Sequence, residues 1–322
     1  MAEYKGTHGT KIQNYTSDPA NPLTGEVWYN STSNSLKYFY INPGSWATGG
    51  NLNSARSAAL AGAGTQTSAL AFGGNPGERD TEKYNGTSWT AVNNMNSGRG
   101  DLAGCGASNT AALAFGGNSP TENNTETWNG TNWTAVNTLN GGRKRLAGCG
   151  TNTAALAFGG QAPTVAETET WNGTNWTEVN DLGTARYGLA GCGTNTAALA
   201  FGGEVDPPIS NKTELWNGTN WTEVNDLNTA RDLLAGAGTQ TSALAFGGKT
   251  FAATGATESW NGTNWTELAD LANGRFSLAG CGTANTSALA FGGDLGPGNT
   301  PEMFAGTEAW IAGPATATIG TS

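Results

Sequence analysis

One arginine and one glutamate return at a regular spacing along the sequence, and their types and placement suit them for chemistry. A guanidinium donates several hydrogen bonds and a carboxylate accepts them, so the pair can bind a polar ligand or join two parts of a fold. The arginines are Arg56, Arg99, Arg143, Arg186, Arg231 and Arg275. The glutamates are Glu82, Glu126, Glu169, Glu214, Glu258 and Glu308. Six equivalent pairs predict either six ligand sites or six structural ties.

The first interpretation is a repeated sugar site. Each copy also contains tryptophan, and the set Arg, Glu and Trp resembles that of six-bladed fucose-binding lectins. The candidate glycan contacts are Arg99, Arg143, Arg186, Arg231 and Arg275. The second interpretation, which six identical positions favour, is that each arginine bonds main-chain carbonyls or the neighbouring glutamate and holds the fold together.

Other residue sets for catalysis or metal binding are poorly represented. His8 is the single histidine, near the start of the chain. Cys105, Cys149, Cys192 and Cys281 share one position of the repeat, which alanine fills in the other two copies, so we expect small, buried, unpaired thiols. No acid pair of the glycosidase kind can be selected among carboxylates that recur six times or scatter in loops. We therefore expect a non-enzymatic protein without a cofactor or a metal.

The composition indicates a folded chain of low charge. Its 322 residues include 49 glycines and 12 tryptophans, and 12% are charged, against about 25% in typical proteins. A net charge of -10 would repel a phosphate backbone, so we expect no nucleic-acid partner. No apolar run approaches the roughly 20 residues that cross a bilayer, and the start lacks an apolar signal segment. We expect no membrane insertion, and synthesis in a cytoplasm.

The repeat is marked by Phe-Gly-Gly, which returns after 43, 43, 43, 45 and 45 residues. No segment between glycines is long enough to express a helical period. Asn-Gly between short Trp- and Thr-rich runs instead predicts tight β-hairpins. Residues 110–115 alternate bulky and small side chains, which predicts a strand with one face of each kind. Trp128 and Trp133 flank a hairpin turn, and we expect both rings on one face of the sheet.

Six copies of four short strands predict an all-β, six-bladed β-propeller. A single four-stranded unit cannot bury both of its faces, so the units must pack face to face and close into a ring. The last copy has no obvious fourth strand after Trp310, whereas the residues around Trp46 align with those around Trp89. We predict that an N-terminal strand near Trp46 completes the last blade.

The order of the segments resembles the kelch repeat. Each copy has an arginine-led inner strand, an apolar strand ending in Gly-Gly, an aromatic residue before a turn and a tryptophan after it. The resemblance covers roughly Trp46 to Trp310, with copies a few residues shorter than the usual length of about 50. It implies a propeller, a fold that carries both enzymes and interaction modules. Copper-dependent kelch oxidases use His and Tyr ligands, which a chain with one histidine does not supply.

Residues 1–45 have a different pattern, and we expect an N-terminal attachment segment with a β-hairpin, followed by the propeller at residues 46–322. Gly-Glu-Val-Trp-Tyr-Asn begins at Gly25 and Ser-Leu-Lys-Tyr-Phe-Tyr begins at Ser35. The two runs resemble a small hairpin module of tail-fibre and other virion proteins of tailed bacteriophages. This resemblance implies docking to other virion proteins. The candidate virion anchor residues are Trp28, Tyr29, Tyr38 and Tyr40.

The segment between the second and third strands differs in sequence and length among the copies, whereas the Asn-Gly turns are nearly identical. In an up-and-down blade this segment emerges on the same rim as the connections between blades. Diversity on a rigid scaffold is typical of a binding surface, although unconstrained loops also drift freely. The candidate partner-binding residues are Glu78, Arg79, Asp80, Glu122, Asn123, Pro163, Val165, Asp206, Pro207, Ile209, Lys249, Phe251, Leu295 and Asn299.

Together these patterns predict a structural protein of a phage virion, of the tail-fibre or adhesin type, that presents its propeller for attachment to host-surface glycans. One alternative is a structural adaptor or capsid decoration protein that contacts only other virion proteins. A second alternative is a tail-associated polysaccharide depolymerase, which needs a catalytic acid pair. The expected location is the virion, after assembly in the host cytoplasm.

Overall fold

The computed structural model describes residues 12–20, 22–23, 25–56, 60–74, 79–118, 122–161, 163–297 and 303–321, except for the side chains of residues 40–43 and 313–321. All regular secondary structure in these ranges is β, so none of them holds a helix that could cross a membrane. The chain divides into two compact units. The first unit is Met1–Ser45 with Ala312–Ser322, and the second is Trp46–Ile311.

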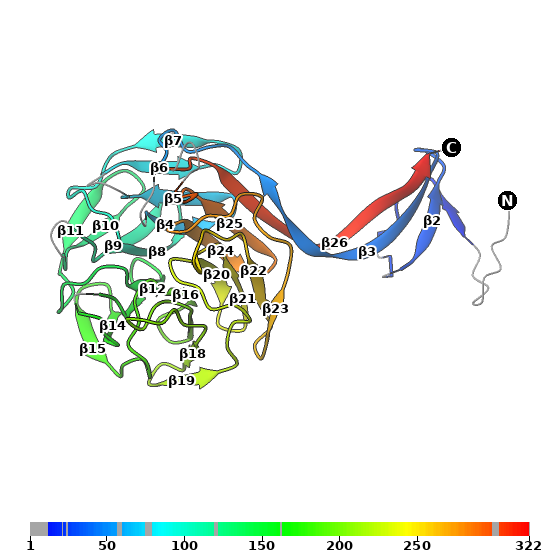
Figure 1. Cartoon of the computed structure of the whole chain (residues 1–322). Coiled ribbons are helices and arrows are strands. Elements are labelled where there is room, and N and C mark those ends of the chain that lie inside the picture. Colours follow the sequence, from blue (N-terminus) through cyan, green and yellow to red (C-terminus); the bar gives the residue numbers. More distant parts are fainter. Residues whose placement is uncertain are drawn as a thin grey trace. The chain divides into compact units, whose positions relative to one another are not determined.

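The second unit is a six-bladed β-propeller, as the repeat predicts (Figure 1). Each of blades 1 to 5 is a four-stranded antiparallel sheet whose strands follow one another in chain order. Blade 1 contains β4 (Ala61–Thr65), β5 (Ser68–Phe72), β6 (Thr81–Tyr84) and β7 (Trp89–Val92). Blade 2 contains β8 (Ala103–Ser108), β9 (Ala111–Phe115), β10 (Thr125–Trp128) and β11 (Trp133–Val136). Blade 3 contains β12 (Ala147–Gly150), β13 (Ala155–Phe158), β14 (Thr168–Trp171) and β15 (Trp176–Val179). Blade 4 contains β16 (Ala190–Gly193), β17 (Ala198–Phe201), β18 (Thr213–Trp216) and β19 (Trp221–Val224). Blade 5 contains β20 (Ala235–Thr239), β21 (Ser242–Phe246), β22 (Thr257–Trp260) and β23 (Trp265–Glu267).

Blade 6 is assembled from both ends of the repeat region. It contains β24 (Ala279–Ala284), β25 (Ser287–Phe291), the start of β26 (Thr307–Thr321) and the end of β3 (Ser35–Thr48), in that order across the sheet. The Gly49 amide, just after β3, donates to the Thr307 carbonyl at 2.8 Å. The prediction that a strand near Trp46 closes the last blade is therefore confirmed. The sequence did not reveal that residues beyond Ile311 would continue β26.

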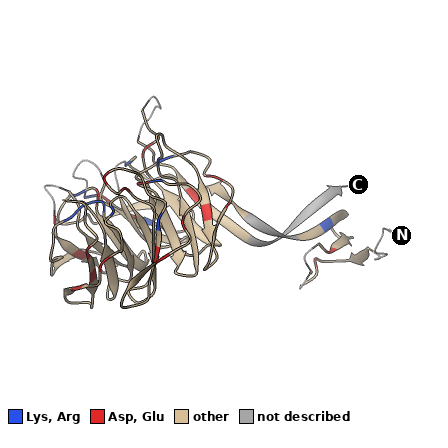
Figure 2. Cartoon of the chain, turned by 60° about the horizontal axis from the view of Figure 1, so that its bottom comes forward, with Lys and Arg blue, Asp and Glu red and all other residues tan. Residues whose placement is uncertain are grey.

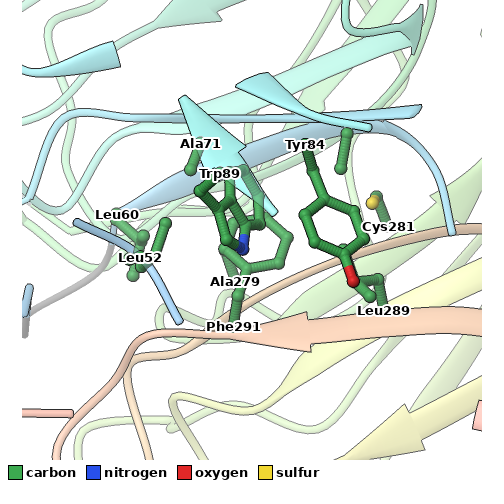
Figure 3. Packing of buried hydrophobic residues seen from close by; sticks show 10 residues of the cluster. Leu52, Leu60, Ala71, Tyr84, Trp89, Ala279, Cys281, Leu289 and Phe291 are labelled. Atoms are coloured by element: carbon green, nitrogen blue, oxygen red, sulfur yellow. The ribbon is translucent and has the colours of Figure 1, made fainter. Parts of the chain in front are cut away.

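Adjacent blades pack a bulky face against a small one. Leu113 and Phe115 of β9 lie in one buried cluster with Ala155 and Ala157 of the next blade, as the alternation predicts. The Phe115 ring also meets Trp176 at a centroid distance of 4.9 Å. Figure 3 shows the same packing where the ring closes, with Trp89 of blade 1 beside Phe291 of blade 6.

The innermost strands are glycine-rich because each phenylalanine reaches into the next blade. A Cβ added to Gly191 of β16 would lie 2.3 Å from Cζ of Phe158, a distance that no side chain tolerates. The same encounter recurs at Gly62, Gly104, Gly148, Gly236 and Gly280. Close packing thus explains the fixed pairing of Phe-Gly-Gly with a glycine in the neighbouring inner strand.

Tryptophans in the outermost strands bond to the preceding blade. Trp133 Nε1 donates to Thr81 Oγ1 at 2.9 Å, and Trp46 Nε1 donates to Thr257 Oγ1 at 3.0 Å. Equivalent bonds start from Trp89, Trp176, Trp221 and Trp265. One such bond crosses each of the six interfaces, so the closing interface is held like the others.

The first unit contains β1 (Gln13–Tyr15), β2 (Val27–Asn30) and the first part of β3. β2 pairs antiparallel with β3 and forms the expected hairpin, while β1 pairs with β2 in parallel. The Asp18 carboxylate accepts hydrogen bonds from Trp28 Nε1, Asn30 Nδ2 and Lys37 Nζ at 2.8 to 3.1 Å. These bonds, chiefly that from Lys37, hold the pKa of Asp18 below its usual value.

Candidate functional site

The propeller has two rims that differ in chemistry. On one rim, which we call the constant rim, lie the hairpin turns between the outer two strands, with the repeated Asn-Gly sequence. These turns contain no charged residue. On the opposite rim, which we call the variable rim, lie the loops between the second and third strands and the connections between blades. Figure 2 shows the turns of the constant rim in tan and most Lys and Arg on the loop side of the ring.

The constant rim is one repeated hydrogen-bond pattern. In each turn the first asparagine side chain caps the next residues: Asn172 Oδ1 accepts from the amides of Thr174 and Asn175 at 2.9 Å. A second asparagine links blades, because Asn137 Nδ2 donates to Asn175 Oδ1 at 2.8 Å. The same link starts from Asn93, Asn180 and Asn225. This rim therefore presents nearly identical surfaces on successive blades.

The loops of the variable rim are tied at their base and differ above it. Short antiparallel bridges join each connection to the loop of its own blade, for example Lys144 with Gln161 and Asp232 with Lys249. In blades 4 to 6 a second bridge folds the loop back on itself. Its partners are Glu204 with Ile209, Lys249 with Ala253, and Asp294 with Met303. Ordered loops of different sequence thus stand on one common framework.

The predicted rim residues differ in exposure. Phe251 is fully exposed at the tip of the blade 5 loop. Arg79, Pro163, Asp206 and Pro207 are also exposed. Partly buried are Asp80, Glu122, Asn123, Val165, Ile209, Lys249 and Leu295. Glu78 and Asn299 lie outside the described residues.

The predicted glycan contacts are not at the surface. Arg99, Arg186, Arg231 and Arg275 have no exposed side-chain surface and Arg143 has 2%. Each lies in an ion pair with the glutamate of its own blade. The N–O distance is 2.5 Å in Arg143–Glu169, 2.8 Å in Arg99–Glu126 and Arg186–Glu214, and 3.1 Å in Arg231–Glu258. Arg56–Glu82 and Arg275–Glu308 form the same pair. This burial argues against direct sugar contact and favours the structural interpretation.

The buried arginine holds the base of the variable loop. Arg186 Nη1 donates to the carbonyls of Gly202 at 2.9 Å and Lys212 at 2.7 Å, the two residues at which the blade 4 loop begins and ends. In blade 1, Arg56 Nη1 bonds the carbonyls of Gly73 and Asp80 in the same way. Burial lowers the pKa of Arg186 and Glu214 opposes that change; arginine nevertheless stays charged at neutral pH. The repeated charges therefore position the loops.

Sequence reasoning missed the partner of the second glutamate oxygen. Glu126 Oε2 accepts from both the amide and Nδ2 of Asn96, each at 2.8 Å. The corresponding donors elsewhere include Asn53, Asn140 and Asn228. The signal was present, because an asparagine precedes the arginine by three residues in four copies. Each glutamate thus joins the incoming connection to its blade.

The candidate anchor residues of the first unit have mixed environments. Trp28 is fully buried, which suits a core residue. Tyr29 is partly buried and donates from Oη to Asn34 Oδ1 at 3.2 Å. Tyr38 is partly buried, and the side chain of Tyr40 lies outside the described set. Leu23 is the large apolar residue with the greatest exposure among the described part of this unit, at 76%.

All four cysteines are free and buried in the inner strands. Each thiol donates to a threonine carbonyl of the next blade at 3.5 Å, as Cys105 does to Thr151. Burial raises the pKa of Cys192 and of Cys281 to about 12, which makes these thiols poor nucleophiles. The described residues contain no cluster of three or more His, Cys, Asp or Glu side chains that could hold a metal ion.

No protein-family model matches the chain, and a search of curated proteins finds no match.

Proposed function

We propose that the chain is a structural protein of a tailed-phage particle that uses the variable rim of its propeller to attach to the host surface. The observation that carries this proposal is the contrast between the rims. Ordered loops of different sequence stand on six equivalent buried supports, whereas the opposite rim repeats one pattern. Such a design keeps the scaffold rigid while the recognition surface changes.

The assignment to a virion rests on the resemblance of the β2–β3 hairpin to a module of phage virion proteins. Glycans are the expected targets because several weak contacts spread around a ring gain from multivalency on a densely glycosylated surface. With the arginines buried, the contacts fall to loop residues such as Phe251, Arg79 and Asp206. An aromatic side chain can stack on the apolar face of a sugar, and charged groups can bond its hydroxyls.

Binding of the purified full-length chain to intact candidate bacterial hosts tests this proposal. Untreated cells and cells oxidised with periodate are compared, since periodate destroys vicinal diols of glycans. Phe251→Ser changes the variable rim, and Thr174→Ser on the constant rim is the matched control. We expect binding that periodate abolishes, that Phe251→Ser weakens and that the control leaves unchanged.

Other outcomes separate the alternatives. Binding to no host, together with capture of particle proteins by the full chain, would favour the adaptor or decoration role. Release of oligosaccharide from purified host polysaccharide would favour the depolymerase.

A further inference from the structure

The axial opening of the propeller on the variable rim is lined by residues that differ between blades. A cavity of about 100 Å³ lies there. Its floor is a ring of six leucines, one from each blade: Leu60, Leu102, Leu146, Leu189, Leu234 and Leu278. Above them, Arg145, Gly188, Leu233 and Ser277 also line the cavity. These four occupy one position of the repeat, two residues after the buried arginine.

This upper ring has an unusual backbone. Arg145, Leu233 and Ser277 have φ values of 53°, 52° and 52°, and Gly188 has 61°. Asp101, the equivalent residue of blade 2, has 51°. Each amide donates to the carbonyl of the preceding ring residue at 2.7 to 2.8 Å, from Asp101 through to Ser277. Glycine would fit without strain, as it does in blade 4, but the other described copies carry side chains there at about 1 kcal/mol each. Strain of this kind often accompanies a binding role.

A buried carboxylate without a full set of partners lies beside this ring. Asp232 precedes Leu233 and is 1% exposed, and its Oδ1 accepts no hydrogen bond within the described residues. Its Oδ2 is 3.8 Å from Lys249 Nζ. Glu204 and Arg145 are close enough to act on the same carboxylate. A buried acceptor normally has a donor, so the site calls for a ligand or a bound water.

Charges of both signs surround the opening, and this decides the class of ligand. Arg145 and Lys249 are each about one-third exposed, and Arg145 Nε lies 3.4 Å from Asp101 Oδ1. A cationic ligand would meet these two bases, and an anionic ligand would meet Asp232, Glu204 and Asp101. A neutral polyhydroxylated molecule meets neither difficulty, because a hydroxyl both donates to a carboxylate and accepts from a guanidinium or ammonium group.

We propose that the axial opening binds one edge of a neutral sugar, with Asp232 and Arg145 contacting its hydroxyls and the leucine ring contacting its apolar face. The cavity volume suits a hydroxymethyl group or one ring edge more than a whole monosaccharide. This inference extends the proposed attachment function, since it names the class of target. It also places a single site on the axis, unlike the six equivalent sites that the arginine repeat suggests.

Saturation-transfer NMR on the purified full-length chain tests this inference without host cells. The probes are the methyl glycosides of glucose, galactose and mannose, with N-acetylneuraminic acid and glucosamine as charged comparisons. Arg145→Gly removes the side chain while adopting the residue found in blade 4, so it relieves strain. Asp232→Asn removes the charge and changes little in shape. Glu178→Gln, exposed on β15, is the control.

We expect at least one neutral glycoside to bind, with about tenfold lower affinity for both variants and no change for the control. Binding by neither wild type nor variants, or equal binding by all of them, overturns the axial site. Periodate-sensitive attachment to host cells would still support the proposed function in that case. Retained glycoside binding with no attachment to any host would overturn the function and leave the axial site standing.

Discussion

The two rims of the propeller are made by the same six repeats and yet behave as different materials. On the constant rim each turn satisfies its own polar groups and bonds the next turn, as Asn137 and Asn175 do. On the variable rim the polar groups of the loop base are satisfied from below by a buried arginine, as Arg186 does for Gly202 and Lys212. Support by a side chain from the inside frees the loop sequence above it. Support by the turn's own asparagines fixes the sequence.

The largest effect is expected from removing the buried support of the variable rim. Glu214→Ala leaves the Arg186 guanidinium buried without its counter-charge, and breaking such a pair costs about 3 to 5 kcal/mol. Chemical denaturation should show this loss in the free energy of unfolding. Glu223→Ala, which removes an exposed carboxylate of the same blade, is the control and should change it by less than about 0.5 kcal/mol. Equal, small effects of the two variants would contradict a supporting role for the pair.

A second effect concerns Asp232 at the axial opening. Burial raises its pKa to about 6, with Lys249 opposing and Glu204 adding to the rise. The unfolded chain has the ordinary aspartate pKa of about 3.9, so the fold disfavours the charged form. Its favourable contribution is therefore present below about pH 4 and is lost as pH rises through 6.

Asp232→Asn should remove this dependence. Relative to wild type, the variant should gain up to about 2 kcal/mol in free energy of unfolding between pH 4 and pH 8. Denaturant titrations at the two pH values measure the difference. A constant gap between the two proteins across this range would show that Asp232 titrates normally in the fold.

On the constant rim, a turn glycine should matter more than its neighbours. Gly173 has a φ of 92°, and a Cβ there would lie 3.3 Å from the Thr153 carbonyl oxygen. Gly173→Ala should lower the free energy of unfolding by about 1 kcal/mol. Thr174→Ala in the same turn, at an exposed position, should change it by less than half as much. A shift in thermal midpoint of only one of the two variants would confirm that backbone conformation fixes this rim.

The smallest effect on stability is expected at the tip of the variable rim. Phe251 is fully exposed, so Phe251→Ser should leave the free energy of unfolding within about 0.5 kcal/mol of wild type. Thermal unfolding is the measurement. A larger loss would mean that the loop contributes to the fold, and the contrast between the rims would weaken.

Much of the fold was predictable because the repeat carries local signals. Asn-Gly turns and the pairing of Trp128 with Trp133 give strands and register, and the Phe-Gly-Gly spacing gives the number of blades. The closing strand followed from the alignment of Trp46 with Trp89. The fate of the arginines was not decidable in the same way, because a repeated charge has the same sequence pattern whether it faces solvent or a buried glutamate.

The axial ring was also hidden from sequence reasoning. A left-handed backbone is usually marked by glycine, but Arg145 and Leu233 carry side chains there. The unpartnered oxygen of Asp232 depends on contacts between blades that are about 30 to 90 residues apart in the chain. Neither property can be assigned from neighbouring residues alone.

The closure of blade 6 by β3 and β26 has a mechanical consequence. Both chain crossings between the two units run inside strands of this blade, at residues 45 to 46 and 311 to 312. Tension applied through the first unit would enter the propeller along two strands at once. Extraction then requires the ladder between β26 and β25 to shear as a whole rather than to open one bond at a time from a free end. The same joint that completes the ring would make it resistant to pulling.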